Sequence, residues 1–572
     1  MPFTPAIREQ QYVLDTVVGF AALAATERFE AASPDLVEAV LEGAGAFAAG
    51  EWAPLSREGD INGPKWSDAG VTMPPGYAAA YRAYVEGGWG TIGAPSDFGG
   101  QGLPFVLQSA VLETLGTANM GFALAPILTL GAIEALIHHG TPEQQARYLP
   151  RLATGEWTGT MNLTESQAGS DVGALRSRAE PVGDGTWRLF GTKIFISFGD
   201  HDMADNIVHL VLARTPDAPA GTRGISLFLV PKYRLDAEGK PGRSNDVRVV
   251  SIEHKMGLHA SPTCVLSFGD NSECIGELIG REMGGMAAMF TMMNNARLNV
   301  GLQGVQVAEA ATQKAVEFAR ERIQSARAGS PDKSSVAIIE HPDVRRMLMR
   351  MKAQTQAARA LVYLAAGMVD RAGLGDEGAK DRLEILTPLA KAHATDIGNE
   401  VASLGVQVHG GMGYIEETGA AQFFRDARIT PIYEGTNGIQ AADLVGRKLT
   451  LANGAAFATL IADMRAEAED PALRTLIDAC DQLGHRLSSA DADDRLAASY
   501  PFLTMLSVAT CGWLIERQGR AAADGTDDFL RMKGAVAAFY IEQIVPEALG
   551  LRAAASASAA GLYALPAALF AA

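Results

Sequence analysis

The sequence predicts an α+β protein that is mainly α-helical and has four parts. A helical N-terminal domain spans 1–157, a middle antiparallel β-domain 158–280, a helical bundle 281–449 and a helical C-terminal extension 450–572. Two observations predict this order. Apolar residues recur at helical spacing toward both ends of the chain, whereas short runs rich in β-branched and aromatic residues fill the middle.

The N-terminal part has the pattern of packed helices. Apolar residues recur at helical spacing in "REQQYVLDTVVGFAALAATERFEAA" (8–32) and in "PFVLQSAVLETLGTANMGFALAPILTLGAIEALIHHG" (104–140). The next helix is expected to begin at Thr141, a good N-cap, because Pro142 suits the first helical position.

The middle part has the pattern of strands. The runs "TWRLFGTKIFIS" (186–197), "NIVHLVLART" (206–215) and "GISLFLVP" (224–231) are separated by Gly- and Pro-rich turns. Several such runs at short spacing predict a small antiparallel sheet or barrel.

Helical patterning returns after residue 280. The segments 285–324, 341–372 and 382–410 are long enough to be bundle helices. In the extension, "DFLRMKGAVAAFYIEQIVPEAL" (528–549) has apolar periodicity, so the extension is expected to pack as helices against the rest of the chain.

Composition excludes several classes of protein. A chain of 572 residues with 48% hydrophobic and 20% charged residues is an ordinary globular protein of three or more domains. The formal charge of −18 disfavours nucleic acid and anionic membranes as partners. The four cysteines form no CxxC pair, which favours a reducing compartment and disfavours a zinc site.

No targeting or membrane segment is expected. The N-terminal "MPFTPAIREQQYVLD" lacks the basic and apolar regions of a signal peptide. No apolar run is expected to reach the roughly 20 residues that a membrane-spanning helix needs. The sequence therefore predicts a cytoplasmic enzyme.

One acid stands apart near the end of the predicted bundle. In "PIYEGTNGIQ" (431–440), Glu434 lies between Tyr433 and Gly435, with no metal ligand, lysine or second acid beside it. A carboxylate that is removed from water has a raised pKa and can act as a general base without a metal. We therefore expect no metal site, and Glu434 is the candidate catalytic residue.

Three motifs in this order resemble the acyl-CoA dehydrogenase family. They are "LTESQAGSDVGA" (163–174), "QVHGGMGYIEE" (407–417) and "RDARITPIYEGTNGIQ" (425–440), and the resemblance covers roughly residues 40–449. The whole chain most resembles a longer bacterial branch, which includes enzymes that act on 3-(methylthio)propanoyl-CoA.

The resemblance implies FAD as the cofactor and an acyl-CoA thioester as the substrate. The FAD-binding residues that it implies are Met161, Leu163, Thr164, Gly169, Ser170, Phe195, Ile196, Ser197, Arg322, Gln324, Gln407, Gly410, Gly411 and Thr436. The substrate-binding residues that it implies are Ser170, Asn294, Arg297, Tyr433 and Gly435. Glu165 and Asp171, within the first motif, are expected to be structural acids.

Several of these residues have an implied role. Phe195 would stack near the isoalloxazine ring, and Ser197 would offer its hydroxyl to flavin N5. Arg322 would reach the pyrophosphate of a FAD held mainly by another subunit, which implies a homodimer or a dimer of dimers. The Phe-Gly that follows in many relatives is replaced here by Ser325 and Ala326.

The resemblance also implies a mechanism. Glu434 would remove the α-proton while the β-hydride passes to flavin N5, giving a trans-2-enoyl thioester. The Glu434 backbone N–H and a ribityl hydroxyl would bond the thioester oxygen. An electron-transferring flavoprotein would then accept the electrons.

Two alternatives stay open at this stage. The chain could be an oxidase that passes electrons to oxygen, or a non-catalytic relative that binds nucleic acid, although it lacks a basic terminal extension. The acyl chain length also stays open, from 3-(methylthio)propanoyl to medium- and long-chain groups, because pocket depth depends on side chains of 122–131 and of the bundle.

Overall fold

The computed structural model describes residues 3–571, apart from the side chains of residues 292 and 294. The chain forms two compact units. The first unit comprises residues 39–296, and the second joins the N-terminal residues up to 38 to residues 297–572. The predicted α+β, mainly helical architecture is confirmed, and the four-domain division stays a prediction.

The first unit combines helices with all the strands of the described residues. Its helices are α3 (Pro34–Phe47), whose first turns belong to the second unit, α4 (Ala53–Asn62), α5 (Tyr77–Glu86), α6 (Phe105–Ala118), α7 (Met120–His139) and α8 (Pro142–Thr154). Thr141 caps α8 as expected. Its hydroxyl accepts from Gln144 N–H while the Gln144 side chain accepts from Thr141 N–H, a reciprocal capping box.

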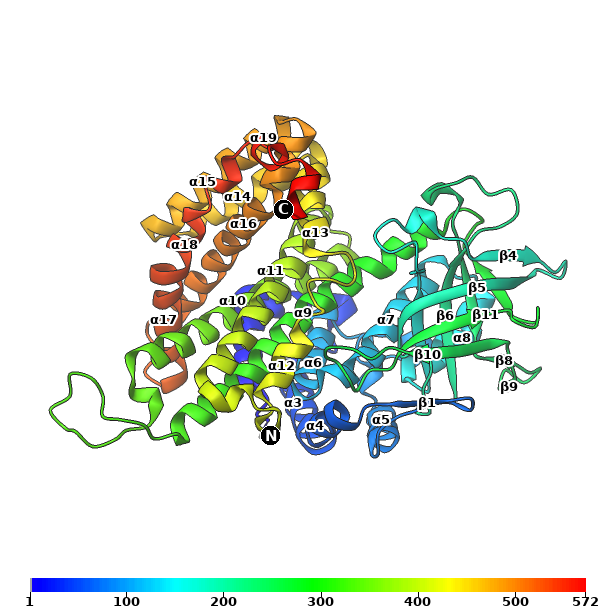
Figure 1. Cartoon of the computed structure of the whole chain (residues 1–572), viewed down its shortest axis with the longest axis horizontal. Helices are drawn as coiled ribbons and strands as arrows, with labels where there is room; N and C mark the ends of the chain where they lie inside the picture. Colours follow the sequence, from blue (N-terminus) through cyan, green and yellow to red (C-terminus); the bar gives the residue numbers. More distant parts are fainter. Residues whose placement is uncertain (1–2, 572) are drawn as a thin grey trace. The chain divides into compact units, whose positions relative to one another are not determined.

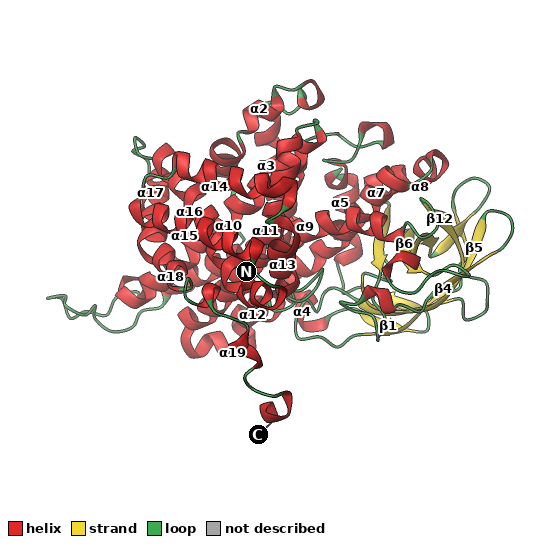
Figure 2. Ribbon diagram, turned by 90° about the horizontal axis from the view of Figure 1, so that it is seen from above, coloured by secondary structure: helices red, strands yellow, loops and turns green. Residues whose placement is uncertain are grey.

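The strands form one large sheet and two short hairpins (Figure 2). The large sheet contains β3 (Trp157–Asn162), β4 (Arg178–Pro181), β5 (Thr186–Ser197), β6 (Asn206–Ala213), β7 (Ser226–Pro231), β10 (Val247–Ile252), β11 (Thr263–Phe268) and β12 (Ile275–Ile279). The hairpins pair β1 (Lys65–Ser67) with β2 (Gly70–Thr72), and β8 (Tyr233–Leu235) with β9 (Pro241–Ser244).

The sheet order is β10-β11-β5-β12-β7-β6-β3, with β4 beside β5. The three strands predicted from the sequence are β5, β6 and β7. The expectation of a purely antiparallel sheet is wrong at one edge, where β3 pairs with β6 in parallel. Every residue of β3, β6 and β7 is buried, so both faces of these strands are covered, although buried polar side chains such as Thr160 and His209 lie among the apolar ones.

A buried ion pair fastens the loop after β3 to β5. Lys193 Nζ donates to Glu165 Oε1 at 2.8 Å, and the side chains are 0% and 6% exposed. Glu165 also accepts from Ser177 Oγ and from Arg176 N–H. Although burial raises it, these partners lower the pKa of Glu165 to about 2. Glu165 is therefore a structural acid, as predicted, whereas Asp171 is exposed.

The second unit is helical. Its helices are α1 (Ile7–Val13), α2 (Phe20–Ala24), the greater part of α9 (Gly285–Glu321), α10 (Pro342–Gly373), α11 (Glu377–His409), α12 (Ala420–Ala427), α13 (Asn437–Asp443), α14 (Ala455–Glu467), α15 (Pro471–Ser489), α16 (Ala492–Ala521), α17 (Asp528–Phe539), α18 (Val545–Gly550) and α19 (Ala560–Tyr563). Helices α10 and α11 run side by side (Figure 1).

The C-terminal extension is an integral part of this helical unit, as predicted. Helix α16 packs against α10, α11, α13 and α15. Its middle stretch, Phe502–Ile515, is almost wholly buried. The extension therefore covers the side of the bundle that carries α13, directly after Glu434.

Buried charges join the N-terminal helix to the extension. Lys533 of α17 donates to Glu9 Oε1 at 2.8 Å and to Gln356 Oε1 at 3.0 Å. Arg359 of α10, which is fully buried, pairs with Glu309 of α9 at 2.8 Å. Charges of opposite sign must be brought together here, because a lone ion in this interior would be costly.

The expectation that no apolar stretch is long enough to span a membrane is wrong. Helices α7 and α16 are long and apolar enough, but 78% and 83% of their most apolar stretches are buried inside the protein. Burial of this kind is typical of core helices, because the apolar surface is already covered by other parts of the chain.

Glu165→Gln is expected to destabilise the first unit by about 3–5 kcal/mol at neutral pH, because it leaves Lys193 buried without its anionic partner. The pKa of Glu165 is lowered on folding, so its contribution is present above pH about 4.5. It is lost as the pH falls toward about 2. Urea unfolding of the wild type and the variant should therefore differ most at neutral pH and progressively less below pH about 4.5.

Glu180→Gln is the matched control. Glu180 pairs with Arg178 on the same sheet, but both side chains are about half exposed. Exposed pairs contribute about 0–1 kcal/mol. Equal losses in the two variants would contradict a structural role for the buried pair.

Candidate active site

Glu434 lies on a tight turn between α12 and α13. The turn is held by backbone hydrogen bonds from Tyr433 N–H to Ile429 O and from Asn437 N–H to Pro431 O. Thr436 then caps α13, because its hydroxyl accepts from Ile439 N–H. Glu434 itself has a φ of +55°. A non-glycine residue held in this region is strained, and such strain gathers at functional sites.

Gly435 is required by the same turn. Its φ is +83°, and a Cβ at this position would lie 2.9 Å from Gln440 Nε2 and 3.8 Å from Arg297 Nη2. Side chains of the protein itself therefore come close to the backbone at this glycine. It brings Arg297, another predicted site residue, next to the turn.

The Glu434 carboxyl has a raised pKa. Burial raises the pKa above its ordinary value, and the charges of Arg297 and Lys391 lower it in part. Arg297 is 8% exposed, and burial lowers the pKa of its guanidinium. Burial therefore favours the protonated carboxyl, while the two cations favour its ionised form.

The wall beside Glu434 is aromatic and fixed. Tyr433 donates its hydroxyl hydrogen to Gln303 Oε1 of α9. Burial raises the pKa of Tyr433 well above its ordinary value, with the Glu434 charge adding to the effect. The ring therefore stays neutral and supplies an apolar surface next to the carboxyl.

Four residues that connect to this turn were not predicted from the sequence. Lys391 Nζ donates to Asn437 Oδ1 at 2.9 Å, and Asn437 Nδ2 donates to Asp396 Oδ1 at 2.8 Å. Tyr500 of the extension donates to Asp396 Oδ2 at 2.8 Å. The signal that could have found Lys391 is a single lysine inside the apolar stretch "LTPLAKAHA".

The other predicted residues of the second unit lie at helix ends. Arg322 and Gln324 are exposed where α9 ends. Gln407, Gly410 and Gly411 are exposed where α11 ends, and Gly410 takes a φ of +60°.

The neighbouring Gly413 is fixed by packing, because a Cβ there would lie 2.2 Å from Val406 O. The side chain of Asn294 lies outside the described residues.

In the first unit, the structure brings two predicted segments together. Ile194 N–H donates to Thr164 O at 3.0 Å, and Lys193 Nζ donates to Leu163 O at 3.1 Å. The end of β3 and the end of β5 therefore lie side by side. Met161, at this end of β3, is 8% exposed.

Phe195, near the end of β5, combines an unusual backbone conformation with an exposed side chain. Its φ is +61°, and its side chain is 59% exposed. The register between β5 and β11 shifts here, so the bulge turns the ring outward. Ile196 follows it, but its side chain is 3% exposed and belongs to the core. Ile196 can therefore contribute only backbone groups to a ligand, while Ser197 is half-buried.

Gly169 and Ser170 lie on an exposed turn after β3. A Cβ at Gly169 would have nothing within 4 Å, so packing inside the protein does not require this glycine.

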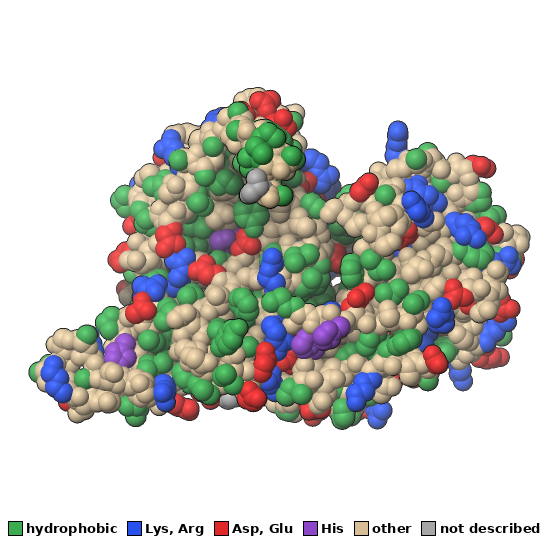
Figure 3. All heavy atoms as spheres, in the orientation of Figure 1, with side chains coloured by type: hydrophobic (Ala, Val, Ile, Leu, Met, Phe, Trp, Pro, Cys, Tyr) green, Lys and Arg blue, Asp and Glu red, His purple; other side chains and the backbone are tan. Residues whose placement is uncertain are grey.

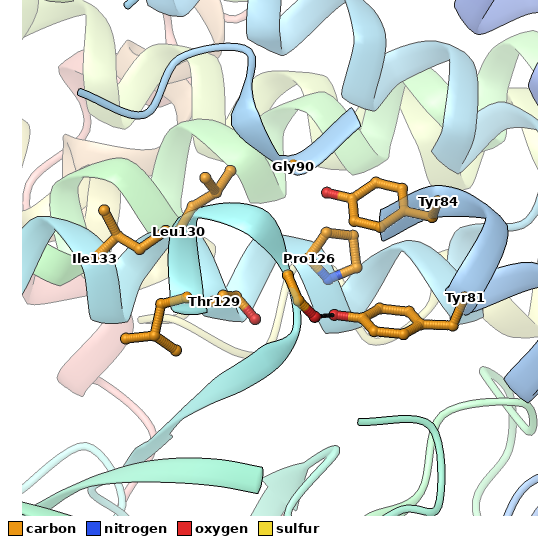
Figure 4. Close-up of a pocket in the computed structure, with 9 residues that line it drawn as sticks. Tyr81, Tyr84, Gly90, Pro126, Thr129, Leu130 and Ile133 are labelled. Carbon is orange, nitrogen blue, oxygen red and sulfur yellow. Dashed lines mark hydrogen bonds between the residues drawn. The ribbon is translucent and has the colours of Figure 1, made fainter. Parts of the chain in front are cut away.

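A small cavity lies beside the predicted 122–131 segment in the first unit (Figure 4). It has a volume of about 10 Å³ and is lined by Tyr81, Tyr84, Pro126, Thr129 and Leu130, among others. Tyr81 donates to Gly155 O at 2.9 Å. A cavity of this size holds about one water molecule, so it is too small for an acyl chain.

Comparison with known proteins defines the class. Four family models match in order: "Acyl-CoA dehydrogenase, N-terminal domain" at 35–156, "middle domain" at 160–271, "C-terminal domain" at 283–449, and "Acetyl-CoA dehydrogenase C-terminal like" at 449–566. The chain belongs to the acyl-CoA dehydrogenase family, a family of enzymes.

Particular relatives span nearly the whole chain. It is 43% identical to the 3-methylmercaptopropionyl-CoA dehydrogenase of Ruegeria pomeroyi, over 96% of this chain and 97% of that protein. It is 32% identical to a broad-specificity linear acyl-CoA dehydrogenase of Mycobacterium tuberculosis, over 94% and 95% of the two chains. Its fold matches an acyl-CoA dehydrogenase of Bacillus anthracis, solved in complex with FAD, with a TM-score of 0.73, 22% identity, and 91% and 88% coverage.

Gly435→Ala is expected to destabilise the second unit by about 1–3 kcal/mol. Alanine is strained at a φ of +83°, and its methyl group would press against the buried Gln440 amide. Urea unfolding measures the loss. Gly438→Ala is the control, because its nearest neighbour would be 3.7 Å away and alanine suits a helix. Similar values for both variants would mean that the turn tolerates a side chain at Gly435.

Proposed function

We propose that the protein is a FAD-dependent acyl-CoA dehydrogenase in which Glu434 removes the α-proton of an acyl-CoA thioester, giving the trans-2-enoyl-CoA. The observation that carries this proposal is a single carboxyl with a raised pKa on a strained turn, beside a neutral aromatic wall. An α-proton of a thioester needs one well-placed base and no metal, because the carbonyl oxygen takes up the negative charge.

The turn can also stabilise that charge. In the described part of the chain, no acceptor receives the Glu434 backbone N–H, so this donor is available to the thioester oxygen. The Arg297 guanidinium next to Gly435 adds positive charge to the same region.

The residues present fit FAD. The chemistry that FAD supplies when bound is a two-electron oxidation, in which it accepts the hydride from the substrate β-carbon. In the first unit, Phe195 presents its ring on a strained bulge, beside the strand end that carries Leu163 and Thr164. An exposed aromatic ring held in this way suits stacking against a flat ring system. In the second unit, Arg322 supplies a cation for a pyrophosphate.

The proposed substrate is a short acyl-CoA, with 3-(methylthio)propanoyl-CoA first. Its support is the 43% identity to a dehydrogenase of that substrate. A linear fatty acyl-CoA is the second candidate, supported by the broad-specificity relative that is 32% identical.

The proposed electron acceptor is an electron-transferring flavoprotein, and the proposed assembly is a homodimer or a dimer of dimers. The exposed Arg322 suits a contact with FAD of a second copy. A chain that elutes as a monomer at low micromolar concentration and retains FAD would contradict the assembly. The cytoplasm is the proposed compartment, because all four cysteines are free and buried.

Nucleic-acid binding has no support on the visible surface. On the face in Figure 3, basic and acidic side chains are scattered among one another without a broad basic patch. With a formal charge of −18, the chain would repel a polyanion.

Glu434→Gln is expected to slow flavin reduction by about 10²–10⁴-fold, because it keeps the size of the side chain but removes the base. The protein should still bind FAD and remain yellow. Anaerobic stopped-flow measurement with a good acyl-CoA separates this step from reoxidation.

Glu417→Gln is the matched control, since Glu417 is an exposed acid on the glycine-turn segment. It should reduce flavin at nearly the wild-type rate. Normal reduction by Glu434→Gln, with loss in Glu417→Gln or Glu416→Gln, would assign the base to another acid.

A scan of acyl-CoA thioesters with an artificial electron acceptor is expected to give the highest kcat/KM for 3-(methylthio)propanoyl-CoA and short linear chains. Each methylene that a pocket cannot hold costs about 1–3 kcal/mol in kcat/KM. A maximum at long chains would favour the second substrate candidate. Rapid reoxidation in air with stoichiometric peroxide would instead identify an oxidase.

A further inference from the structure

The C-terminal extension reaches the active-site turn through one chain of hydrogen bonds. It begins at the Tyr500 hydroxyl on α16, which donates to Asp396 Oδ2 of α11 at 2.8 Å. Asn437, the first residue of α13, donates its Nδ2 to Asp396 Oδ1 at 2.8 Å. Lys391 Nζ then donates to Asn437 Oδ1 at 2.9 Å. Asn437 is three residues from Glu434, so the chain of hydrogen bonds passes beside the turn that carries Glu434 and ends at Lys391.

The chemistry of the partners fixes the direction of this chain. A carboxylate only accepts hydrogen bonds and an ammonium group only donates them. An amide between the two can therefore take one orientation, with Nδ2 toward Asp396 and Oδ1 toward Lys391. Asn437 is 3% exposed and Lys391 is 0% exposed, so water does not readily replace either partner.

Several charged groups face the Glu434 carboxyl and Lys391. Arg297 of α9 and Lys391 of α11 both act on Glu434. Glu434 and Asp396 favour the charged form of Lys391, whereas burial and Arg297 oppose it, and the pKa of Lys391 is lowered to about 7. Lys391 is therefore poised between its charged and neutral forms near neutral pH.

Other charged side chains act on the neighbours of Glu434 and Lys391. Asp443, Arg447 and Glu384 act on Arg297. Arg428 acts on both Asp396 and Tyr500. Burial raises the pKa of Asp396, and the hydrogen bonds from Tyr500 and Asn437 lower it in part. Each hydrogen bond to Asp396 thus favours its ionised form.

We propose that Tyr500 is a positioning residue of the active site. It holds Asp396, and through it Asn437 and Lys391, in the arrangement that keeps an ammonium group close to the Glu434 carboxylate. The extension then belongs to the catalytic apparatus as well as to the packing of the bundle. This inference rests on the proposed role of Glu434 as the base.

The direction of the effect follows from the chain. Without the Tyr500 hydroxyl, the Asp396 carboxylate loses one hydrogen-bond donor, so the pKa of Asp396 rises and its ionised form is less favoured. The pKa of Lys391 then falls further, the ammonium group loses its proton, and the pKa of Glu434 rises. The base then stays protonated up to a higher pH. The acidic limb of the pH–rate profile for flavin reduction therefore moves to higher pH.

The test is the pH dependence of anaerobic flavin reduction with an acyl-CoA. Lys391→Met, which removes the charge and keeps the length, is expected to move the acidic limb upward by about one pH unit. Tyr500→Phe is expected to move it in the same direction by a smaller amount, with a loss of rate of about 2–10-fold at pH 6.

Tyr12→Phe is the matched control. The Tyr12 hydroxyl donates to Gln518 O, also on α16, at 2.7 Å and does not take part in the Asp396 chain. This variant loses a comparable hydrogen bond to the same helix, so it should leave the acidic limb in place. An equal shift in Tyr12→Phe would show general loosening of α16 and overturn the proposal.

A second measurement does not depend on turnover. Infrared pH titration can follow the carboxyl band that is absent from Glu434→Gln, and this band should titrate at higher pH in Lys391→Met and Tyr500→Phe. Unchanged titration in both variants overturns the inference, even where Glu434→Gln abolishes reduction. Normal reduction by Glu434→Gln would instead overturn the proposed function, and with it the role of Tyr500 in positioning the base.

Discussion

The partial withdrawal of one carboxyl group from water is the constraint on which this site depends. Glu434 must be deprotonated to act as a base, yet burial opposes its charge. The chain meets both demands by placing Arg297 and Lys391 near the carboxyl and a neutral Tyr433 beside it. The strained φ at Glu434 is tolerated because backbone hydrogen bonds and the Thr436 cap fix the turn on both sides.

The same requirement extends outward through the helical unit. Burial disfavours the charged forms of Arg297 and Lys391 and lowers the pKa of both, so these cations need anionic and polar partners of their own. Asp396 and Asn437 supply these partners for Lys391, and Tyr500 brings the extension into the arrangement. Pairing of buried charges also joins the N-terminal helix to the extension at Glu9 and Lys533, and fastens Glu165 to Lys193 in the first unit.

Much of the architecture was predictable from local patterns. The strands β5, β6 and β7 and the cap at Thr141 follow from β-propensity, turn residues and capping chemistry, which act over a few neighbouring residues. The parallel pairing of β3 with β6 was missed, because the partner of an edge strand is set by packing over a longer range. The apolar length of α7 was also missed, and only its burial identifies it as a core helix.

The sequence by itself determined the order of helices and strands, the family motifs and the identity of Glu434 as the lone acid, since each is written in contiguous residues. Only the tertiary structure decided which groups, distant in the sequence, lie close to that acid. Lys391 and Asp396 come from α11 and Tyr500 from α16, all distant from Glu434 in the chain, and their charges and hydrogen bonds matter only at a few ångströms. The Coulomb interaction depends on the distance between charges, and the loss of hydration depends on burial. Neither can be derived from the sequence, because both are set only when the chain has folded.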